Sequence, residues 1–332
     1  MTTTITPVDP APPEAPPIPA PPPPPVAPKP VPAASPEPAG LVTPPAPRPG
    51  PFWARLSGTA FSILAAVLLG FIAQFTVLGD LGHDRAQKLA FANFRADLAL
   101  ATAPVNHVSE DGKTPLAEGT AVAVIEIPAI GVHEVVFEGT DSGVLTRGPG
   151  HRRDTVFPGQ AGTSILMGRR AGYGGPFSRI GELAGGDRIS VITGQGEQSY
   201  EVMGVRRAGD PQPAALVPGA GRLTLITADG TAYLPDNVLR VDAKLTSKVR
   251  DPSSLAVSTA LLPPAEQMLG IDLIALVPLV LWGQLMFVSA LAMAWVRQRL
   301  GLWHAWLIGL PVLTLLGLLV AGQVTRLLPN LI

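Results

Sequence analysis

Residues 223–230, "LTLITADG", have the composition of a buried strand that runs into a tight turn. The end of a strand that opens into a loop is a common place for a reactive side chain. Here that place is taken by Ala228, whose methyl group has no reactive atom. Its neighbours Thr227 and Asp229 carry oxygen atoms, but either would need a partner base or a lowered pKa to act as a nucleophile.

Other chemistry is restricted by the residue types that the chain lacks. There is no cysteine, which excludes disulfides, thiolate metal sites and every cysteine-nucleophile mechanism. The histidines are scattered and none has the spacing of a metal-binding motif: His83, His107, His133, His151 and His304. The stretches "GYGGP" and "GAGR" lack the strand-to-helix context of phosphate-binding loops. We therefore expect no metal and no cofactor.

Composition favours a membrane protein over a nucleic-acid-binding protein. The formal net charge is −1 and only 15% of the residues are charged, whereas nucleic-acid recognition requires a basic face. Apolar residues make up 47% of the chain and the mean hydropathy is +0.32, values that indicate membrane segments.

The first 52 residues form a proline-rich stretch that includes "PPIPAPPPPPVAPKPVP". Such a composition cannot build a packed core, so we expect a disordered tail with polyproline II character. The tail could serve as a flexible tether or as a docking ligand for a cytoplasmic partner.

Three apolar stretches are long enough to cross a bilayer as helices: 56–79, 271–297 and 302–328. Basic residues precede the first stretch and lie between the other two: Lys29, Arg48, Arg55, Arg297 and Arg299. Positive charge favours the cytoplasmic side of a membrane. We therefore predict a multi-pass protein of the cytoplasmic membrane, with a cytoplasmic N-terminus and an extracytoplasmic domain between the first two spans.

That domain covers residues 119–246 and consists of short alternating or apolar runs separated by Gly, Pro and Asp. The pattern predicts an all-β domain of seven or eight strands, a closed barrel or a sandwich. Residues 80–118 before it have helical periodicity followed by a linker, and residues 247–270 after it read as a second linker.

The β domain resembles a sortase over nearly its whole length, most closely the class E type. The resemblance is carried by four blocks: "VIEIPAIGVHEVVFEGT", "LTRGPGHRRDTVFPGQAGTSILMGRRAGYGGPF", "LAGGDRISVIT" and "LTLITADG". It implies an eight-stranded β-barrel outside the cytoplasmic membrane. It also implies a cysteine transpeptidase that cleaves a sorting signal and transfers the protein to an amine.

The catalytic residues that the resemblance implies are absent or displaced. Arg169 stands where the family has its catalytic His, and Ala228 stands where it has the nucleophilic Cys. The family's catalytic Arg corresponds to Val238, or to Arg240 after a local slip, since the two share one face of a strand. His151 in "GPGH" resembles a structural position of the family.

These replacements predict a degenerate, cysteine-less member that does no transpeptidation. Acyl transfer through an enzyme intermediate needs a nucleophilic heteroatom, which alanine does not offer. A guanidinium stays charged throughout the physiological range and cannot shuttle protons as an imidazole does.

One functional hypothesis is a pseudoenzyme that binds an extended peptide in a cationic groove. Its candidate binding residues are Arg169, Arg170, Thr227, Asp229 and Arg240. The arginines could hold a carboxylate through bidentate contacts. The alternative for Arg169 is that it points into solvent or pairs with Asp229 or Asp187.

Two other hypotheses remain open. The chain could be a scaffolding subunit of a cell-envelope membrane complex, because three spans exceed what a simple anchored sortase requires. Its partners would then be the membrane and other envelope or membrane proteins. It could instead be an active peptidase or transpeptidase that uses displaced, non-cysteine residues.

Overall fold

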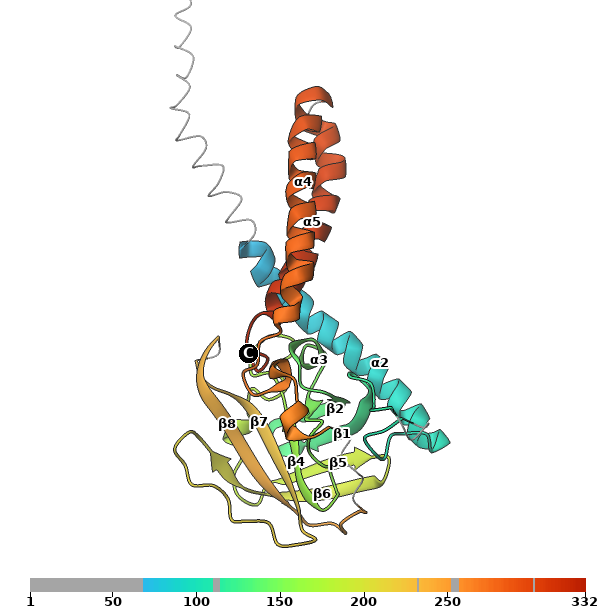
Figure 1. The fold of residues 1–332 in the computed structure, drawn as a ribbon, viewed down its shortest axis with the longest axis vertical. Coiled ribbons are helices and arrows are strands. Elements are labelled where there is room, and N and C mark those ends of the chain that lie inside the picture. The colour runs from blue at the N-terminus through green and yellow to red at the C-terminus, as the bar shows by residue number, and fades with distance from the viewer. Residues whose placement is uncertain (1–67, 110–113, 232, 252–256, 301) are drawn as a thin grey trace, which may run out of the picture. The chain divides into compact units, whose positions relative to one another are not determined.

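The computed structural model describes residues 68–109, 114–231, 233–251, 257–300 and 302–332 (Figure 1). All of these residues belong to one unit of the chain. The predicted tail, 1–52, and the part of the predicted span 56–79 that precedes Leu68 lie outside the described residues.

Eight strands form a closed barrel in the order β1-β2-β3-β4-β7-β8-β6-β5. Their bounds are β1 Ala121–Ile127, β2 Val132–Glu138, β3 Gly150–His151, β4 Gly162–Met167, β5 Arg188–Thr193, β6 Gly196–Arg206, β7 Gly221–Thr231 and β8 Leu234–Leu245. Neighbouring strands are antiparallel except for the parallel pairs β2–β3 and β4–β7. The structure thus confirms the eight-stranded barrel and decides against a sandwich.

Alternating side chains explain why these segments form the wall of a barrel. Along β7, Leu223 and Leu225 pack in the main core, whereas Ile226 and Ala228 belong to a separate apolar cluster. Successive residues of a strand point to opposite faces, so one strand serves both clusters. Strand β7 pairs with β4 on one side as far as Ile226 and with β8 on the other, where Ala228 lies opposite Val238.

A helix precedes the barrel and packs against it. Residues 68–73 are α-helical, a π-helical turn follows at Gln74–Leu78, and α2 spans Gly79–Leu100. Phe94 of α2 is fully buried in a cluster with residues of β1 and β2. Gln87 accepts a hydrogen bond from the backbone N–H of Val135 at 2.7 Å and donates one to the Val135 carbonyl at 3.1 Å. The helix is therefore held to β2 by apolar and polar contacts.

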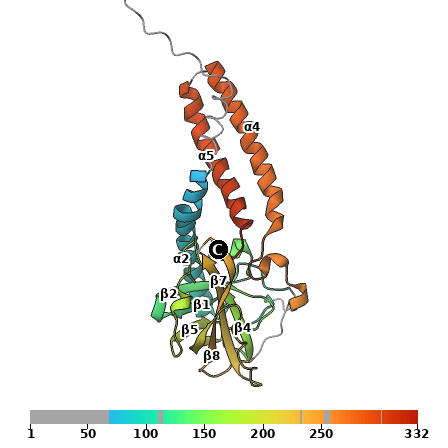
Figure 2. The same ribbon diagram turned by 90° about the vertical axis from the view of Figure 1, so that its left-hand side faces the viewer.

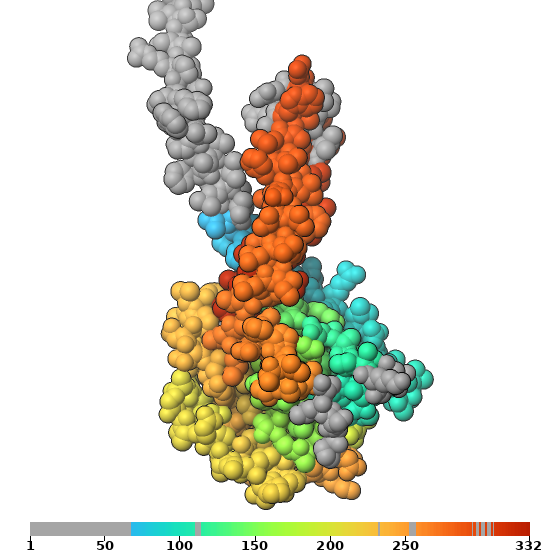
Figure 3. Space-filling view, viewed as in Figure 1, coloured from blue at the N-terminus to red at the C-terminus, as the bar shows by residue number. Residues whose placement is uncertain are grey.

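After the barrel come three 3₁₀ turns, Thr259–Leu261, Pro264–Glu266 and Leu273–Ala275, and then two long helices. Helices α4 (Leu276–Leu300) and α5 (Leu302–Arg326) lie side by side in both ribbon views (Figures 1 and 2). Helix α4 is uncovered along its length in the space-filling view (Figure 3). Its exposed large apolar side chains include Val277, Val280, Leu281, Leu285, Phe287, Val288 and Leu291.

Two helices of the described residues, not three, are long and apolar enough to cross a membrane. They cover Leu273–Met293 and Gly309–Arg326, within the predicted spans 271–297 and 302–328. Only residues 68–79 of the first predicted span are described, and they are helical. The described residues therefore indicate membrane association through the α4–α5 pair.

Candidate functional site

Ala228 lies in β7 directly opposite Val238 of β8 and is fully buried. It belongs to an apolar group that we call the β7 cluster: Leu145, Met167, Ile226, Ala228, Val238 and Leu331. Five of these residues come from the barrel and its loops, whereas Leu331 comes from the end of the chain. The environment of the Ala228 methyl group is therefore dry and apolar.

The two oxygen-bearing neighbours of Ala228 are committed to other contacts. Thr227 points to the opposite face of β7 and donates a hydrogen bond to the Gly168 carbonyl at 2.9 Å. Asp229 lies 3.8 Å from the guanidinium of Arg170 and 3.5 Å from that of Arg207. No described histidine is hydrogen-bonded to either residue, so neither has a general base beside it.

Arg169 has none of its side chain exposed to solvent, contrary to the alternative that it points into water. Its Nη1 donates to the main-chain oxygen of Ile332 at 2.6 Å. Its Nη2 donates to the Ser142 carbonyl at 3.1 Å and to the Ser142 hydroxyl at 2.7 Å. No Asp or Glu side chain of the described residues lies within 4.0 Å, so the alternative ion pairs of Arg169 are also absent.

Burial lowers the pKa of Arg169 to about 10, although Tyr173 and Asp141 act in the opposite direction. The guanidinium therefore stays charged at neutral pH. A buried charge is costly unless hydrogen bonds satisfy it, so each oxygen that faces Arg169 matters to the stability of the site.

Tyr173 completes the surroundings of the guanidinium. Its ring centroid lies 5.2 Å from Cζ of Arg169, within the range of a cation–π interaction. The same ring meets Phe75 edge to face at a centroid distance of 5.7 Å. Tyr173 adopts a φ of 47°, a left-handed conformation that is unfavourable for a bulky residue and needs surrounding contacts to hold it.

Arg170 lies between Ala228 and the end of the chain. Its backbone N–H donates to the Leu331 carbonyl at 2.9 Å, and its Nη1 donates to the Ala228 carbonyl at 3.2 Å. The predicted binding residues Arg170 and Asp229 are thus brought together. Arg169 faces Ile332 through a separate bond, so the two adjacent arginines both contact the same short segment.

Of the two candidates for the displaced arginine position, Val238 is the residue opposite Ala228. Arg240 lies opposite Ile226, and its Nη2 is 3.3 Å from the sulfur of Met268. Val238 brings no charge to the β7 cluster, and Arg240 points its guanidinium toward the linker that follows the barrel.

The segment that fills the site is the stretch after α5. Asn330 and Leu331 are fully buried, and Ile332 is 3% exposed. The side-chain amide of Asn330 donates to the carbonyls of Thr140 at 2.7 Å and Gln267 at 3.0 Å. This occupation had no signal in the sequence, because it depends on a contact between distant parts of the chain.

Comparison with known proteins agrees with this architecture. Residues 125–245 match the family model described as the sortase domain. Over 85 residues the chain is 36% identical to Sortase D of Bacillus subtilis (strain 168). That match covers 26% of this chain and 41% of the relative, so the chain spans less than half of the relative's length.

Solved sortase structures are also similar. Sortase E1 from Streptomyces coelicolor, solved with a tripeptide in the active site, is 28% identical, with a TM-score of 0.36. The match covers 43% of this chain and 97% of that one. A Sortase D5 transpeptidase of Clostridium perfringens is 24% identical, with a TM-score of 0.39, and the match covers 49% of this chain and 99% of that one.

Residues 125–245 of the chain match a sortase domain. Its sortase domain carries Ala228 and Arg169 at the two positions where the resemblance leads one to expect Cys and His. Two consecutive residues contact these positions. Leu331 packs in the β7 cluster, which contains Ala228, and Ile332 accepts a hydrogen bond from Arg169.

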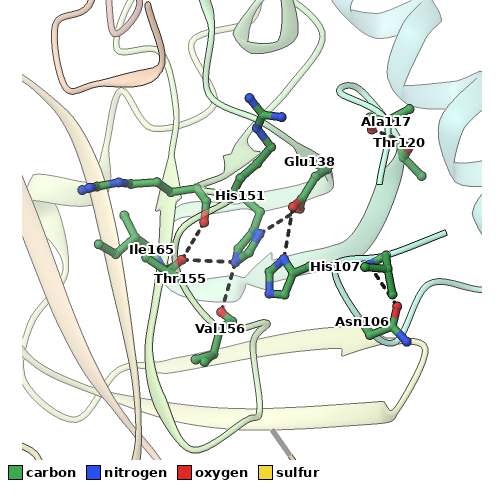
Figure 4. Close-up of polar contacts among 12 residues, drawn as sticks. Asn106, His107, Ala117, Thr120, Glu138, His151, Thr155, Val156 and Ile165 are labelled. Carbon is green, nitrogen blue, oxygen red and sulfur yellow. Dashed lines mark hydrogen bonds and ion pairs between the residues drawn. The ribbon is translucent and has the colours of Figure 1, made fainter. Parts of the chain in front are cut away.

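A second polar cluster lies elsewhere in the sortase domain and was missed from the sequence. His107, Glu138 and His151 are buried, and their ligand-type atoms lie within 4.8 Å of one another. Figure 4 shows both imidazoles directed at the carboxylate. Nδ1 of His151 is 2.8 Å from Glu138 and Nδ1 of His107 is 3.3 Å from it.

Hydrogen bonds connect the three residues of this cluster. Burial would raise the pKa of Glu138, but the charge of His151 and the hydrogen bonds from both histidines lower it to about 2. Nε2 of His151 is 3.0 Å from the Val156 carbonyl, which can only accept, so that nitrogen carries a hydrogen. Both histidines lie within hydrogen-bond distance of the Glu138 carboxylate, and the three residues form a buried hydrogen-bonded network.

We predict that Glu138→Gln destabilises the protein at pH 7 by roughly 2–4 kcal/mol, because the carboxylate is held far below its ordinary pKa of 4.5. A depressed folded-state pKa gives stability that is present above the unfolded-state pKa. That stability is lost as the pH falls from about 4.5 toward about 2. The wild-type protein should therefore lose stability steeply over this range, and the variant should lose less.

The measurement is chemical denaturation of the full chain in detergent at a series of pH values. Glu126→Gln is the matched control, because Glu126 lies on the exposed face of β1. Equal stability of the Glu138 and Glu126 variants at pH 7 would contradict the proposed network.

Proposed function

We propose that this chain is a membrane-anchored, sortase-like pseudoenzyme that acts as a scaffolding subunit of a cell-envelope membrane complex. The observation that carries the proposal is Ala228, a buried methyl group at the position of the expected nucleophile. The chain has no cysteine to replace it. Acyl transfer needs an atom with a lone pair at this place, and none is present.

The residue at the expected histidine position cannot supply proton transfer. Arg169 remains charged at neutral pH, and its terminal nitrogens donate to Ser142 and Ile332. A group that already donates its hydrogens and cannot accept one is a poor acid–base catalyst. The permanent charge of the guanidinium and its hydrogen bonds therefore support a structural role for Arg169.

The contents of the site favour scaffolding over the binding of a separate peptide. Leu331 packs on the β7 cluster, and the backbone of residues 330–332 uses the hydrogen-bonding groups of Arg169 and Arg170. An extended peptide would have to displace this segment. The uncovered apolar face of α4 then remains as the larger surface for a membrane or a membrane protein.

The arrangement in the membrane follows from charge. We propose that the last turn of α4, which includes Arg299, faces the cytoplasm, and that the sortase domain lies outside. The N-terminus would then be cytoplasmic, where the proline-rich stretch 1–52 could recruit a partner. The first predicted span, 56–79, would complete a three-span topology.

An active peptidase with displaced residues is the alternative. Its candidates are Thr227 and Asp229, but the Thr227 hydroxyl donates to Gly168 and Asp229 faces two arginines. Neither arrangement gives a strong nucleophile, because an arginine neighbour stabilises the ionised carboxylate and no base faces the hydroxyl.

We predict that the purified full-length protein does not cleave a panel of sorting-type peptides faster than buffer alone. Thr227→Val and Asp229→Asn should leave that background rate unchanged, because neither side chain takes part in acyl transfer. Peptide cleavage is followed by mass spectrometry of the products. Turnover by the wild-type protein that either substitution abolishes would show that the protein is an enzyme.

Scaffolding predicts a defined partner in the membrane. Crosslinking of the full-length chain in native membranes, followed by mass spectrometry, should return one reproducible membrane or envelope protein. Replacing Leu285 and Phe287 of α4 by alanine should reduce the yield of that crosslink several-fold, because both are exposed apolar side chains. Val217→Ala, at an exposed position of the sortase domain, is the matched control. Recovery of the wild-type chain without any partner would overturn the scaffolding role.

A further inference from the structure

We propose that the degenerate active site has become a socket for the chain's own segment Asn330-Leu331-Ile332, which fixes the α4–α5 pair to the sortase domain. The socket consists of Thr140, Ser142, Arg169, Arg170, Gln267 and the barrel residues of the β7 cluster. The inference rests on the proposed function, since it names the occupant of the same site.

The backbone of the segment is held as an extended peptide is held by a binding protein. The Leu331 carbonyl accepts from the N–H of Arg170 at 2.9 Å, and the Ile332 oxygen accepts from Arg169 at 2.6 Å. The N–H of Asn330 donates to the Gly270 carbonyl at 3.0 Å. Three consecutive residues thus use their main-chain groups on the socket and its rim.

Each side chain of the segment meets a matching surface. The Asn330 amide faces the carbonyls of Thr140, Ala265 and Gln267 at 2.7, 3.2 and 3.0 Å, a set that only a hydrogen-bond donor satisfies. Leu331 enters the dry β7 cluster, and Ile332 packs with Phe75 and Tyr173. The socket therefore selects a donor amide followed by two large apolar residues.

The electrostatics of Arg169 require an occupant. The guanidinium is fully buried and has no acidic side chain of the described residues beside it, and its Nε has no hydrogen-bond partner. Removing Ile332 would take away the shortest of its hydrogen bonds. A buried charge left with fewer partners is strongly destabilising, so the socket holds its occupant firmly.

The segment follows α5 directly, which makes its binding intramolecular. Arg326 at the end of α5 pairs with Asp272, just before α4, at 2.6 Å. Only three residues separate Arg326 from Asn330. A tethered ligand has a high effective concentration, so the segment outcompetes a free peptide of similar sequence.

A single-cysteine labelling experiment tests the socket, because the natural chain has no thiol. Ala228→Cys places one thiol behind Leu331, and its alkylation rate in full-length protein reports access to the site. We expect a rate at least about tenfold slower than that of Val217→Cys, an exposed reference position. Adding Leu331→Asp should speed alkylation of the residue-228 thiol by about tenfold or more, because a carboxylate cannot stay in the apolar cluster.

Two controls separate opening of the socket from unfolding or general charge effects. Leu261→Asp makes the same change at a leucine that is 76% exposed, and it should leave the rate at position 228 unchanged. Ala243→Cys, fully buried in the main core, should stay unreactive in the presence of Leu331→Asp. If it becomes reactive, Asn330→Ala takes the place of Leu331→Asp and should give a smaller acceleration, about threefold or more.

The peptide Arg-Leu-Leu-Pro-Asn-Leu-Ile, which has the sequence of residues 326–332, tests selectivity. Added to the opened variant, it should restore protection of the position-228 thiol, and a version with Asp in place of its last Leu should not. Alkylation of the position-228 thiol as fast as that at position 217, or no effect of either opening substitution, would overturn the socket. Either of these labelling results would contradict the socket but not the proposed non-catalytic function. Peptide cleavage by the wild-type protein would contradict the non-catalytic function, whatever the labelling rates are.

Discussion

The constraint on which this site depends is the buried guanidinium of Arg169, which forms no ion pair with an Asp or Glu side chain of the described residues. Arg169 is held by two oxygens of Ser142, the main-chain oxygen of Ile332 and the ring of Tyr173. Each of these groups comes from a different part of the chain, so the charge can be buried only when all of them are in place. The left-handed conformation of Tyr173 and the position of residues 330–332 bring these groups to the guanidinium.

The same constraint connects the sortase domain to the membrane. Helix α5 is one of the two described helices that could cross a bilayer, and the segment after it ends beside Ala228. In an active sortase this space must receive a substrate. Here Ala228 is fully buried, and Leu331 packs in the same apolar cluster.

Local patterns in the sequence predicted the barrel because alternation and turn residues are short-range signals. The absence of a cysteine could also be read from the sequence, since it needs no structure to interpret. The burial of Arg169 could not be predicted from the sequence, because arginine is ordinarily exposed and its partner Ile332 is far away in the chain. The network of His107, Glu138 and His151 was missed for the same reason, as the barrel brings together residues with no motif spacing.

The proposed socket requires residues 330–332 to lie beside Arg169, Arg170 and the β7 cluster in the folded protein. Hydrogen exchange at the backbone amide of Arg170, which donates to Leu331, tests it most directly. We predict strong protection of that amide in the wild-type protein, and loss of protection in Leu331→Asp while the amides of the main core stay protected. Exchange of the Arg170 amide at the rate of an open loop in the wild-type protein would contradict it.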